Sequence, residues 1–414
     1  MRHKAAVLLV MLCAIFTAGT IASGADYESP PTFSAADILP KGAIAAPGYR
    51  IEEKVTLIGP FFAFVVHSDF GRYLIASHNL LFTRLKEIRI LKSVLDNNKN
   101  KDSEFYGTIK ETLTDSADSA ISIIKDPAKS SERMKQGLVG KWNRVATGLK
   151  EINRQRGRGE DSSIKNIAMG VQKRNLAHKL GLDAYSTNPK VQGFLDHGSG
   201  ERAAGKLIVE IGASLLSGPV GFAVSVGKLD AKLEEQLRIQ SPAQIRDSVS
   251  TTLKSLRVHR FVSTQFIQHE IFSPRHIISI TEALASMEHV DDRGAFLEAA
   301  VTARSEEGAL FYVNMAHSLA EYHKANEPLR KLEPAGQIVI AHAKSGKAVI
   351  VLPVDVIHWD ERAEMIVDNL AELLKRKHLI GELIVAGGVT TKAKKEIAKR
   401  GLELKTGLDL PEKN

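Results

Sequence analysis

The sequence has almost no cysteine, because Cys13 is the only one among 414 residues. Cys13 lies in an apolar run near the N-terminus that we expect to be removed, so the mature chain would contain no thiol. Disulfides, cysteine nucleophiles and thiolate metal sites are then excluded together. Stability has to come from burial, and the roughly 390 residues that remain are enough for two or three domains.

The sequence also lacks the short motifs that identify a reaction. Gly198-Ser199-Gly200 is not in the Gly-x-Ser-x-Gly frame of a serine hydrolase. Residues 387–391 (Gly-Gly-Val-Thr-Thr) have neither the Lys-Ser/Thr of a P-loop nor the spacing of a dinucleotide fingerprint. Their backbone N–H groups could cradle an anion, but we interpret them as a tight turn with a threonine cap. No two histidines have the His-Glu-x-x-His spacing, so we expect packing or surface roles for the histidines.

Residues 1–24 have the three parts of a cleavable secretory signal peptide. Residues 2–4 are basic, residues 5–16 are apolar, and residues 22–25 put small side chains at the −3 and −1 positions of two possible cleavage sites. The apolar part is too short for a stable membrane anchor. Lipidation at Cys13 is disfavoured because Leu12 is bulky and the cysteine comes too early. We therefore predict export to the periplasm or cell envelope, with an uncleaved anchor as the alternative.

Charge is distributed unevenly along the chain. The formal net charge is +8, and removal of Arg2 and Lys4 would leave +6. Between residues 125 and 179 there are 14 Lys and Arg against 5 Asp and Glu, an excess of +9. Such a basic region can be a solvated linker, or it can attract anionic lipid headgroups, an acidic protein or nucleic acid. Nucleic acid is disfavoured outside the cytoplasm, and Trp142 is the only aromatic residue on which bases could stack. The candidate residues for binding an anionic surface are Lys141, Arg144, Lys150, Arg154, Arg156 and Arg158.

Residues 207–229 are the most apolar stretch of the mature sequence and contain four glycines. Small residues at close spacing allow helices to approach closely, in membranes as in protein cores. Glu210 and Pro219 argue against a spanning helix. We therefore expect a buried helical hairpin, with contact to a membrane as the alternative.

The patterning indicates an α+β fold that is predominantly α-helical. A small antiparallel β-meander is expected first, then a helical middle, then a C-terminal α/β domain with the order ββαβαβ. The expected divisions are a signal peptide (1–24), an extended lead-in (25–48), a meander with helices (49–124), a basic helical or linker region (125–180), an α-helical domain with the Gly-rich hairpin (181–330) and a small α/β domain (335–407).

Individual elements follow from the same patterns. The predicted strands are Tyr49–Leu57, Phe61–Val66, Tyr73–Ala76, Gln337–Ala341, Ala348–Leu352, Glu382–Ala386 and Leu402–Lys405. The predicted helices are Leu80–Leu95, Phe105–Ile124, Ile164–Leu180, Gln244–Leu256, Val258–Gln268, Pro274–Met287, Asp292–Ala303, Glu306–Tyr322, Asp360–Arg376 and Thr391–Arg400. In the first helix the apolar residues share one face, and we expect Arg84 and Glu87 to lie mostly elsewhere.

The best polar cluster for chemistry consists of Asp355, His358 and Asp360, just after a predicted strand of the α/β domain. Loops at strand ends are where α/β sheets bind ligands. Two carboxylates and an imidazole could hold a divalent metal or act as an acid–base pair. A simpler interpretation is that Asp360 caps the following helix and Trp359 packs.

Several segments together resemble pieces of exported proteins of Gram-negative bacteria for which no activity is known. They are Val66–Gly71, Leu180–Pro189, Leu352–Asp355 with Trp359, and Thr390–Gly401. The resemblance implies export and a shared fold, and it transfers no functional residue.

Taken together, the sequence favours a non-enzymatic binding or structural protein of the periplasm or cell envelope, with no cofactor indicated. Its expected partner is an anionic membrane surface, contacted peripherally, or an envelope protein. One alternative is a metal-dependent or acid–base hydrolase centred on Asp355, His358 and Asp360. A second is an extracytoplasmic nucleic-acid binder that uses the basic region.

Overall fold

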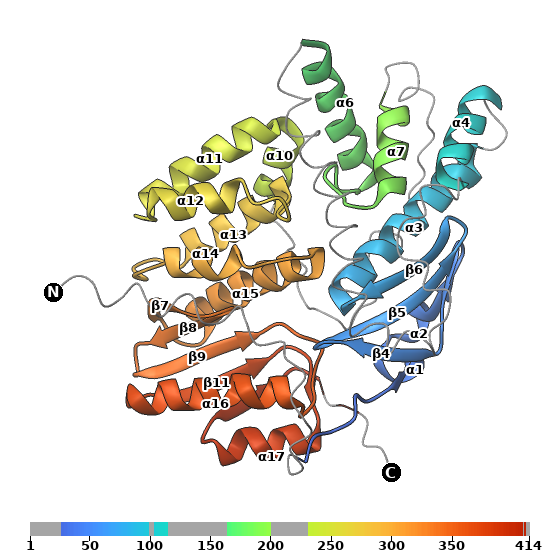
Figure 1. Cartoon of the computed structure of the whole chain (residues 1–414). Helices are drawn as coiled ribbons and strands as arrows, with labels where there is room; N and C mark the ends of the chain where they lie inside the picture. The colour runs from blue at the N-terminus through green and yellow to red at the C-terminus, as the bar shows by residue number, and fades with distance from the viewer. Residues whose placement is uncertain (1–25, 99–102, 115–163, 200–230, 409, 411–414) are drawn as a thin grey trace, which may run out of the picture.

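The computed structural model describes residues 26–98, 103–114, 164–199, 231–408 and 410, and it has an α+β fold with an N-terminal antiparallel sheet. The predicted signal peptide, the Gly-rich stretch 207–229 and all six candidate cations of the basic region lie outside the described residues. Figure 1 shows the N-terminal sheet in blue beside the C-terminal sheet in orange and red, with helices packed along both.

The N-terminal sheet is antiparallel throughout, and β5 is its central strand. Strand β6 pairs with one edge of β5, while β3 and β4 follow each other along the other edge. The strands are β1 (Phe33–Ser34), β2 (Ala45–Ala46), β3 (Tyr49–Ile51), β4 (Lys54–Ile58), β5 (Phe61–Ser68) and β6 (Gly71–Ala76).

The strand predicted over Tyr49–Leu57 is divided in the structure. Ile51 pairs with Val66, and Thr56 pairs with Ala63. The chain therefore advances five residues from β3 to β4 while its partner β5 advances only three. The extra residues form an irregularity between β3 and β4, in which Glu52 turns its carboxylate toward His67, 2.6 Å away. The charged side chain of Glu52 therefore lies where the alternation of buried and exposed residues is interrupted between β3 and β4.

The extended lead-in predicted for residues 25–48 is wrong in its second half. Short helices α1 (Ala35–Ile38) and α2 (Lys41–Ile44) lie there between β1 and β2. Ser34 starts α1 by accepting a hydrogen bond from the N–H of Ala36, 3.1 Å away. Pro40 directly precedes α2, where its fixed φ is compatible with the start of a helical turn.

The helices that follow the first sheet are α3 (His78–Asn98), α4 (Ser103–Thr114), α6 (Ile164–Leu180) and α7 (Pro189–Gly198). The predicted helices Leu80–Leu95 and Ile164–Leu180 are confirmed, the first with a few more residues at each end. Leu81, Ile88 and Leu91 of α3 are completely buried in the core beneath the sheet. The apolar residues of α3 share one buried face as predicted, and the structure shows that this face packs against the sheet. Two charged residues of α3 are also buried, as described below.

The next helices are α10 (Ala231–Ile239), α11 (Pro242–Ser255), α12 (Arg260–Ile267), α13 (Pro274–Ser286), α14 (Gly294–Ala300) and α15 (Glu306–Ala325). Ser241 and Ser273 each precede a proline, and each forms a capping box with the residue three positions on, Gln244 and His276. These caps fix the starts of α11 and α13 at the positions that the sequence predicts, to within two residues.

The C-terminal sheet has the order β13-β11-β9-β8-β7. Strands β9, β11 and β13 are parallel, while β8 and β7 run antiparallel to their neighbours. Helices α14 and α15 contact one face of the sheet, and α16 and α17 the other, as Figure 1 shows. The elements are β7 (Leu329–Ala335), β8 (Ile338–Ala343), β9 (Lys347–Leu352), β10 (Val356–Ile357), α16 (Glu361–Arg376), β11 (Ile380–Val385), β12 (Gly388–Val389), α17 (Thr391–Lys399) and β13 (Glu403–Thr406).

Strand β7 was not among the predicted strands. It is an edge strand in which Arg330 and Lys331 are exposed, and Pro334 has no backbone N–H that could donate a hydrogen bond to a neighbouring strand. These are the features by which proteins protect sheet edges, and they also weaken the alternation that identifies a strand. None of the described helices is both long and apolar enough to cross a bilayer.

Candidate functional site

The loops after β9 and β11 form the edge of the C-terminal sheet at which α/β proteins usually bind ligands. Here the two loops are hydrogen-bonded to each other. The N–H of Gly387 donates to the carbonyl of Val354 at 2.9 Å, and that of Gly388 donates to the carbonyl of Asp355 at 2.9 Å. A Cβ on Gly387 would lie 2.0 Å from the Asp355 carbonyl oxygen, so only glycine fits. Both N–H groups are used within the chain, which favours the tight-turn interpretation over an anion cradle.

Asp355 joins this edge to the N-terminal sheet. Its carboxylate accepts hydrogen bonds from the backbone N–H of Phe62 (3.0 Å) and of His78 (3.1 Å). The ring Nδ1 of His78 lies 3.3 Å from the other carboxylate oxygen. In the opposite direction, the backbone N–H groups of Asp355 and Val356 both donate to the carbonyl of Pro60 at 3.0 Å. Asp355 is 8% exposed, so the carboxylate serves as a buried connector between β5, α3 and the α/β sheet.

His358 and Asp360 pair with each other and not with Asp355. His358 Nε2 lies 3.5 Å from Asp360 Oδ2, and Asp360 Oδ1 accepts the N–H of Ala363 at 2.7 Å as the cap of α16. Trp359 is buried beneath the guanidinium of Arg400, 4.6 Å from the ring centre. The cap and the packed tryptophan are therefore as the simpler interpretation predicts. Among the described residues, no group of three or more His, Cys, Asp and Glu is placed to hold a metal ion.

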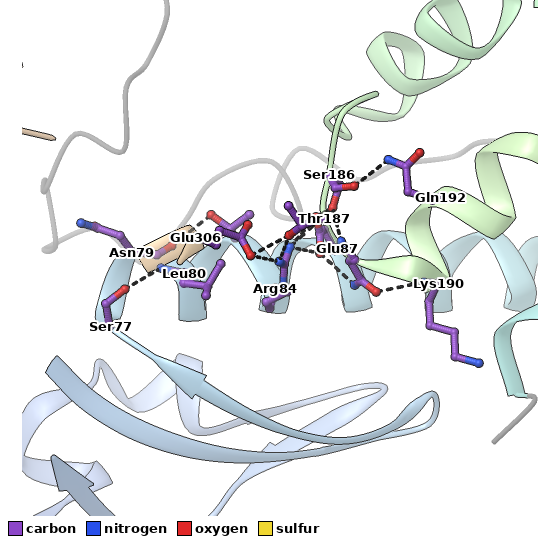
Figure 2. Close-up of polar contacts among 12 residues, drawn as sticks. Ser77, Asn79, Leu80, Arg84, Glu87, Ser186, Thr187, Lys190, Gln192 and Glu306 are labelled. Atoms are coloured by element: carbon purple, nitrogen blue, oxygen red, sulfur yellow. Dashed lines mark hydrogen bonds and ion pairs between the residues drawn. The ribbon is translucent and has the colours of Figure 1, made fainter. Parts of the chain in front are cut away.

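A second polar cluster is buried between α3, α15 and the chain before α7. We call it the buried charge cluster, and Figure 2 shows several of its side chains converging. Arg84 is at its centre and donates to Glu87 at 3.0 Å, to Glu306 at 2.6 Å and to Thr187 at 2.5 Å. The members of the cluster are Arg84, Glu87, Ser186, Thr187, Asn188 and Glu306.

Each carboxylate of the cluster is held by several donors. Glu87 accepts hydrogen bonds from the Ser186 hydroxyl at 2.5 Å and the Asn188 amide at 2.9 Å. Glu306 accepts from the Thr187 hydroxyl at 2.6 Å. Burial alone would lower the pKa of Arg84, but the charges of Glu306 and Glu87 outweigh it and raise this pKa. Burial, with the charge of Glu87 added, raises the pKa of Tyr73 to about 12. The cluster is thus a paired, satisfied network that fixes three elements.

The burial of Arg84 and Glu87 corrects the prediction that both lie off the buried side of their helix. They are 6% and 3% exposed. Their spacing of three residues is the usual spacing of a surface pair, so the sequence of α3 alone cannot distinguish the two cases. The only signal is the polar run Ser186-Thr187-Asn188, whose donors match two buried carboxylates.

Ser279 and His317 form another contact that sequence reasoning missed. The Ser279 hydroxyl lies 2.7 Å from His317 Nε2, a distance at which a base can activate a nucleophile. Ser279 is 2% exposed between α13 and α15, however, so a substrate cannot reach its hydroxyl. Burial lowers the pKa of His317, which is then neutral near pH 7. The pair is best explained as a satisfied contact in the helical core.

A small cleft lies where Arg275 bridges Glu234 (2.9 Å) and Asp183 (3.1 Å). It has room for about one water molecule but not for an organic substrate. Burial would lower the pKa of Arg275, but Asp183 and Glu234 together raise it, so this ion pair network is structural as well.

The sequence matches no family model, and neither the curated proteins nor the solved structures include one that is significantly similar to it.

Proposed function

We propose that this chain is a non-enzymatic binding or structural protein of the periplasm or cell envelope. One observation carries the proposal: the polar side chains that could serve chemistry hold the parts of the chain together. Asp355 binds the backbone of the N-terminal sheet, and Asp360 caps a helix. The buried Arg84 has partners on α3, α15 and the segment before α7. Because these side chains are used in contacts within the chain, we propose that the protein acts through its surfaces.

The same proposal includes the finer organisation. We divide the chain into an N-terminal β-meander with helices, a predominantly helical middle and a C-terminal α/β domain. The buried cores support the two ends of this division, since one core centres on the N-terminal sheet and another lies between the C-terminal sheet, α16 and α17. The third core joins the helical middle to the opposite face of the C-terminal sheet, so these two parts pack directly on each other. The resemblance to exported proteins of Gram-negative bacteria supports the proposed export and does not bear on this division.

The proposed partner is an anionic membrane surface, contacted peripherally, with an envelope protein as the alternative. The support is the excess of +9 between residues 125 and 179, in a chain whose mature net charge would be +6. The apolar stretch 207–229 could add contact with the acyl region. The residues proposed to contact the surface are Lys141, Arg144, Lys150, Arg154, Arg156 and Arg158.

Cell fractionation tests this proposal. We expect the protein in the membrane fraction at low ionic strength and its release by a high-salt wash, because exposed charges are screened by salt. Replacement of the six cations by glutamine should move it to the soluble fraction. A matched control replaces six exposed cations elsewhere: Lys254, Arg257, Arg260, Lys375, Lys394 and Lys395. A wild-type protein that is wholly soluble at low salt would contradict the membrane role.

The rival hydrolase is tested at His358. If a metal is held by Asp355, His358 and Asp360, the purified protein should contain it, and His358→Ala should lose it. We expect instead no stoichiometric metal and no change in melting temperature with a chelator. A bound metal that disappears in His358→Ala would replace our proposal with the hydrolase. The nucleic-acid alternative requires binding at low salt that weakens steeply as salt rises.

A further inference from the structure

The residues that precede β1 lie across the loops at the ligand-binding edge of the C-terminal sheet. We call residues 26–32 the N-terminal arm. The backbone N–H of Glu28 donates to the carbonyl of Trp359 at 2.8 Å, and the N–H of Trp359 donates to Glu28 Oε2 at 2.6 Å. The hydroxyl of Thr390 donates to the same carboxylate oxygen at 2.6 Å. The Glu28 carboxylate is therefore bound between the loop before α16 and the start of α17.

The two residues before Glu28 are also recognised by separate elements. Asp26 Oδ2 lies 2.6 Å from Lys392 Nζ on α17. The Tyr27 hydroxyl donates to Glu364 Oε2 on α16 at 2.7 Å. This hydrogen bond is the main cause that raises the pKa of Tyr27 to about 12. Three consecutive residues with the pattern acid–tyrosine–acid thus contact three different parts of one surface, as a bound peptide would.

The receiving surface is built independently of the arm. Arg400 donates to the second oxygen of Glu364 at 3.0 Å and covers the ring of Trp359. Thr390 also caps α17 by accepting the N–H of Ala393 at 3.3 Å. A carboxylate beside a helix start is favoured by the helix dipole. Glu364, Trp359 and Thr390 are therefore held in place by residues outside the arm, which is what preorganised binding sites require.

The segment that connects Asp26-Tyr27-Glu28 to strand β1 is short and exposed. Residues Ser29, Pro30 and Thr32 are exposed, and β1 begins at Phe33. Two consecutive prolines favour an extended, stiff segment that does not depend on packing. The arm can therefore leave the surface without unpairing β1 from β4.

We propose that the C-terminal α/β domain carries a binding site for a short acidic peptide segment, which is occupied in cis by Asp26-Tyr27-Glu28. The natural ligand in trans is an acidic segment of a partner protein with the same acid–aromatic–acid pattern. The tethered arm acts at a high effective concentration, so a partner binds by displacing it. The inference names a partner class for the proposed binding function, and the site is argued from its own contacts.

The experiment uses the protein without residues 1–29 and a fluorescent peptide with the sequence Ala-Asp-Tyr-Glu-Ser-Pro-Pro. Saturable one-to-one binding is expected for the arm-deleted protein, and binding at least tenfold weaker is expected for the protein that retains its arm, because the peptide must displace the arm. Changing the peptide glutamate to glutamine removes a charge-assisted hydrogen bond and should weaken binding about tenfold or more. In the protein, Lys392→Met should also weaken binding, whereas Lys394→Met, an exposed neighbour on the same helix, serves as the matched control and should not.

A second variant keeps the inference testable if the deletion impairs folding. The full chain with Asp26→Asn and Glu28→Gln should release the arm and bind the peptide. No peptide binding by either folded variant would overturn the inference, as would equal binding of a scrambled peptide. Binding of inorganic phosphate without binding of the peptide would also overturn it. Since fractionation does not involve the arm, failure here leaves the membrane proposal unaffected.

Discussion

Replacing Arg84 with methionine removes the charge that two buried carboxylates share, while the long unbranched side chain is kept. The side chains of Arg84, Glu87 and Glu306 are 8%, 4% and 19% exposed. Without the guanidinium, Glu87 and Glu306 would be negative, close together and largely out of water. Removing one partner of a buried ion pair costs about 3–5 kcal/mol of unfolding free energy. In a unit of 150–250 residues this lowers the melting temperature by about 6–20 °C.

The control is Lys92→Met on the same helix. Lys92 pairs with Asp69 and Asp96 at 3.2 Å, but these partners are half exposed. The loss there should be about 0.2–1 kcal/mol. Chemical denaturation of both variants, with circular dichroism as the signal, measures the difference. If Arg84→Met costs no more than Lys92→Met, the buried charge cluster does not hold the three elements together.

The stability that Arg84→Met loses should be partly restored when the two carboxylates are also neutralised. Adding Glu87→Gln and Glu306→Gln to Arg84→Met removes the uncompensated charges, so the triple variant should be more stable than Arg84→Met alone. A deficit that grows in the triple variant would contradict the electrostatic explanation.

Two further predictions concern other buried groups. Asp355→Ala leaves the N–H groups of Phe62 and His78 without their acceptor and should lower the unfolding free energy by about 2–6 kcal/mol. Asp360→Ala removes only a helix cap and should lower it by about 1 kcal/mol. Equal losses in chemical denaturation would refute the connector role of Asp355. Burial lowers the pKa of His276 below its ordinary value of 6.5. The unfolded chain then binds a proton that the folded chain does not, so stability should fall as pH drops below 6.5, by at most about 1.4 kcal/mol per pH unit. His276→Gln keeps a capping box like that of Ser241 and Gln244 and should flatten this part of the profile; an unchanged slope would show that other groups cause it.

Local patterns in the sequence predict most of the helices. Serine followed by proline starts α11 and α13 through hydrogen bonds within four residues, so no tertiary information is needed. Likewise, Asp360 caps α16 as its position suggests. The strands β9 and β11 are apolar runs because both faces of their sheet are covered by helices.

The features that sequence reasoning missed depend on contacts between distant residues. Arg84 resembles a surface residue until Thr187 and Glu306, far along the chain, surround it. Asp355 resembles a ligand at a strand end, but its partners are Phe62 and His78 in another sheet. Glu28 lies in a segment that composition describes only as extended. In each case the residue type is visible in the sequence, and the partner is set by the fold.

We propose that the protein is exported and binds an anionic membrane surface through its basic region. Co-sedimentation of the mature protein with vesicles tests this most directly. We predict binding to vesicles with anionic lipid at low salt, none to neutral vesicles, and release at high salt. Each cation near such a surface contributes about 1 kcal/mol, so replacing the six proposed residues should cost about 6 kcal/mol and weaken binding by about 10,000-fold. Equal binding to neutral and anionic vesicles, or none to either at low salt, would contradict the account.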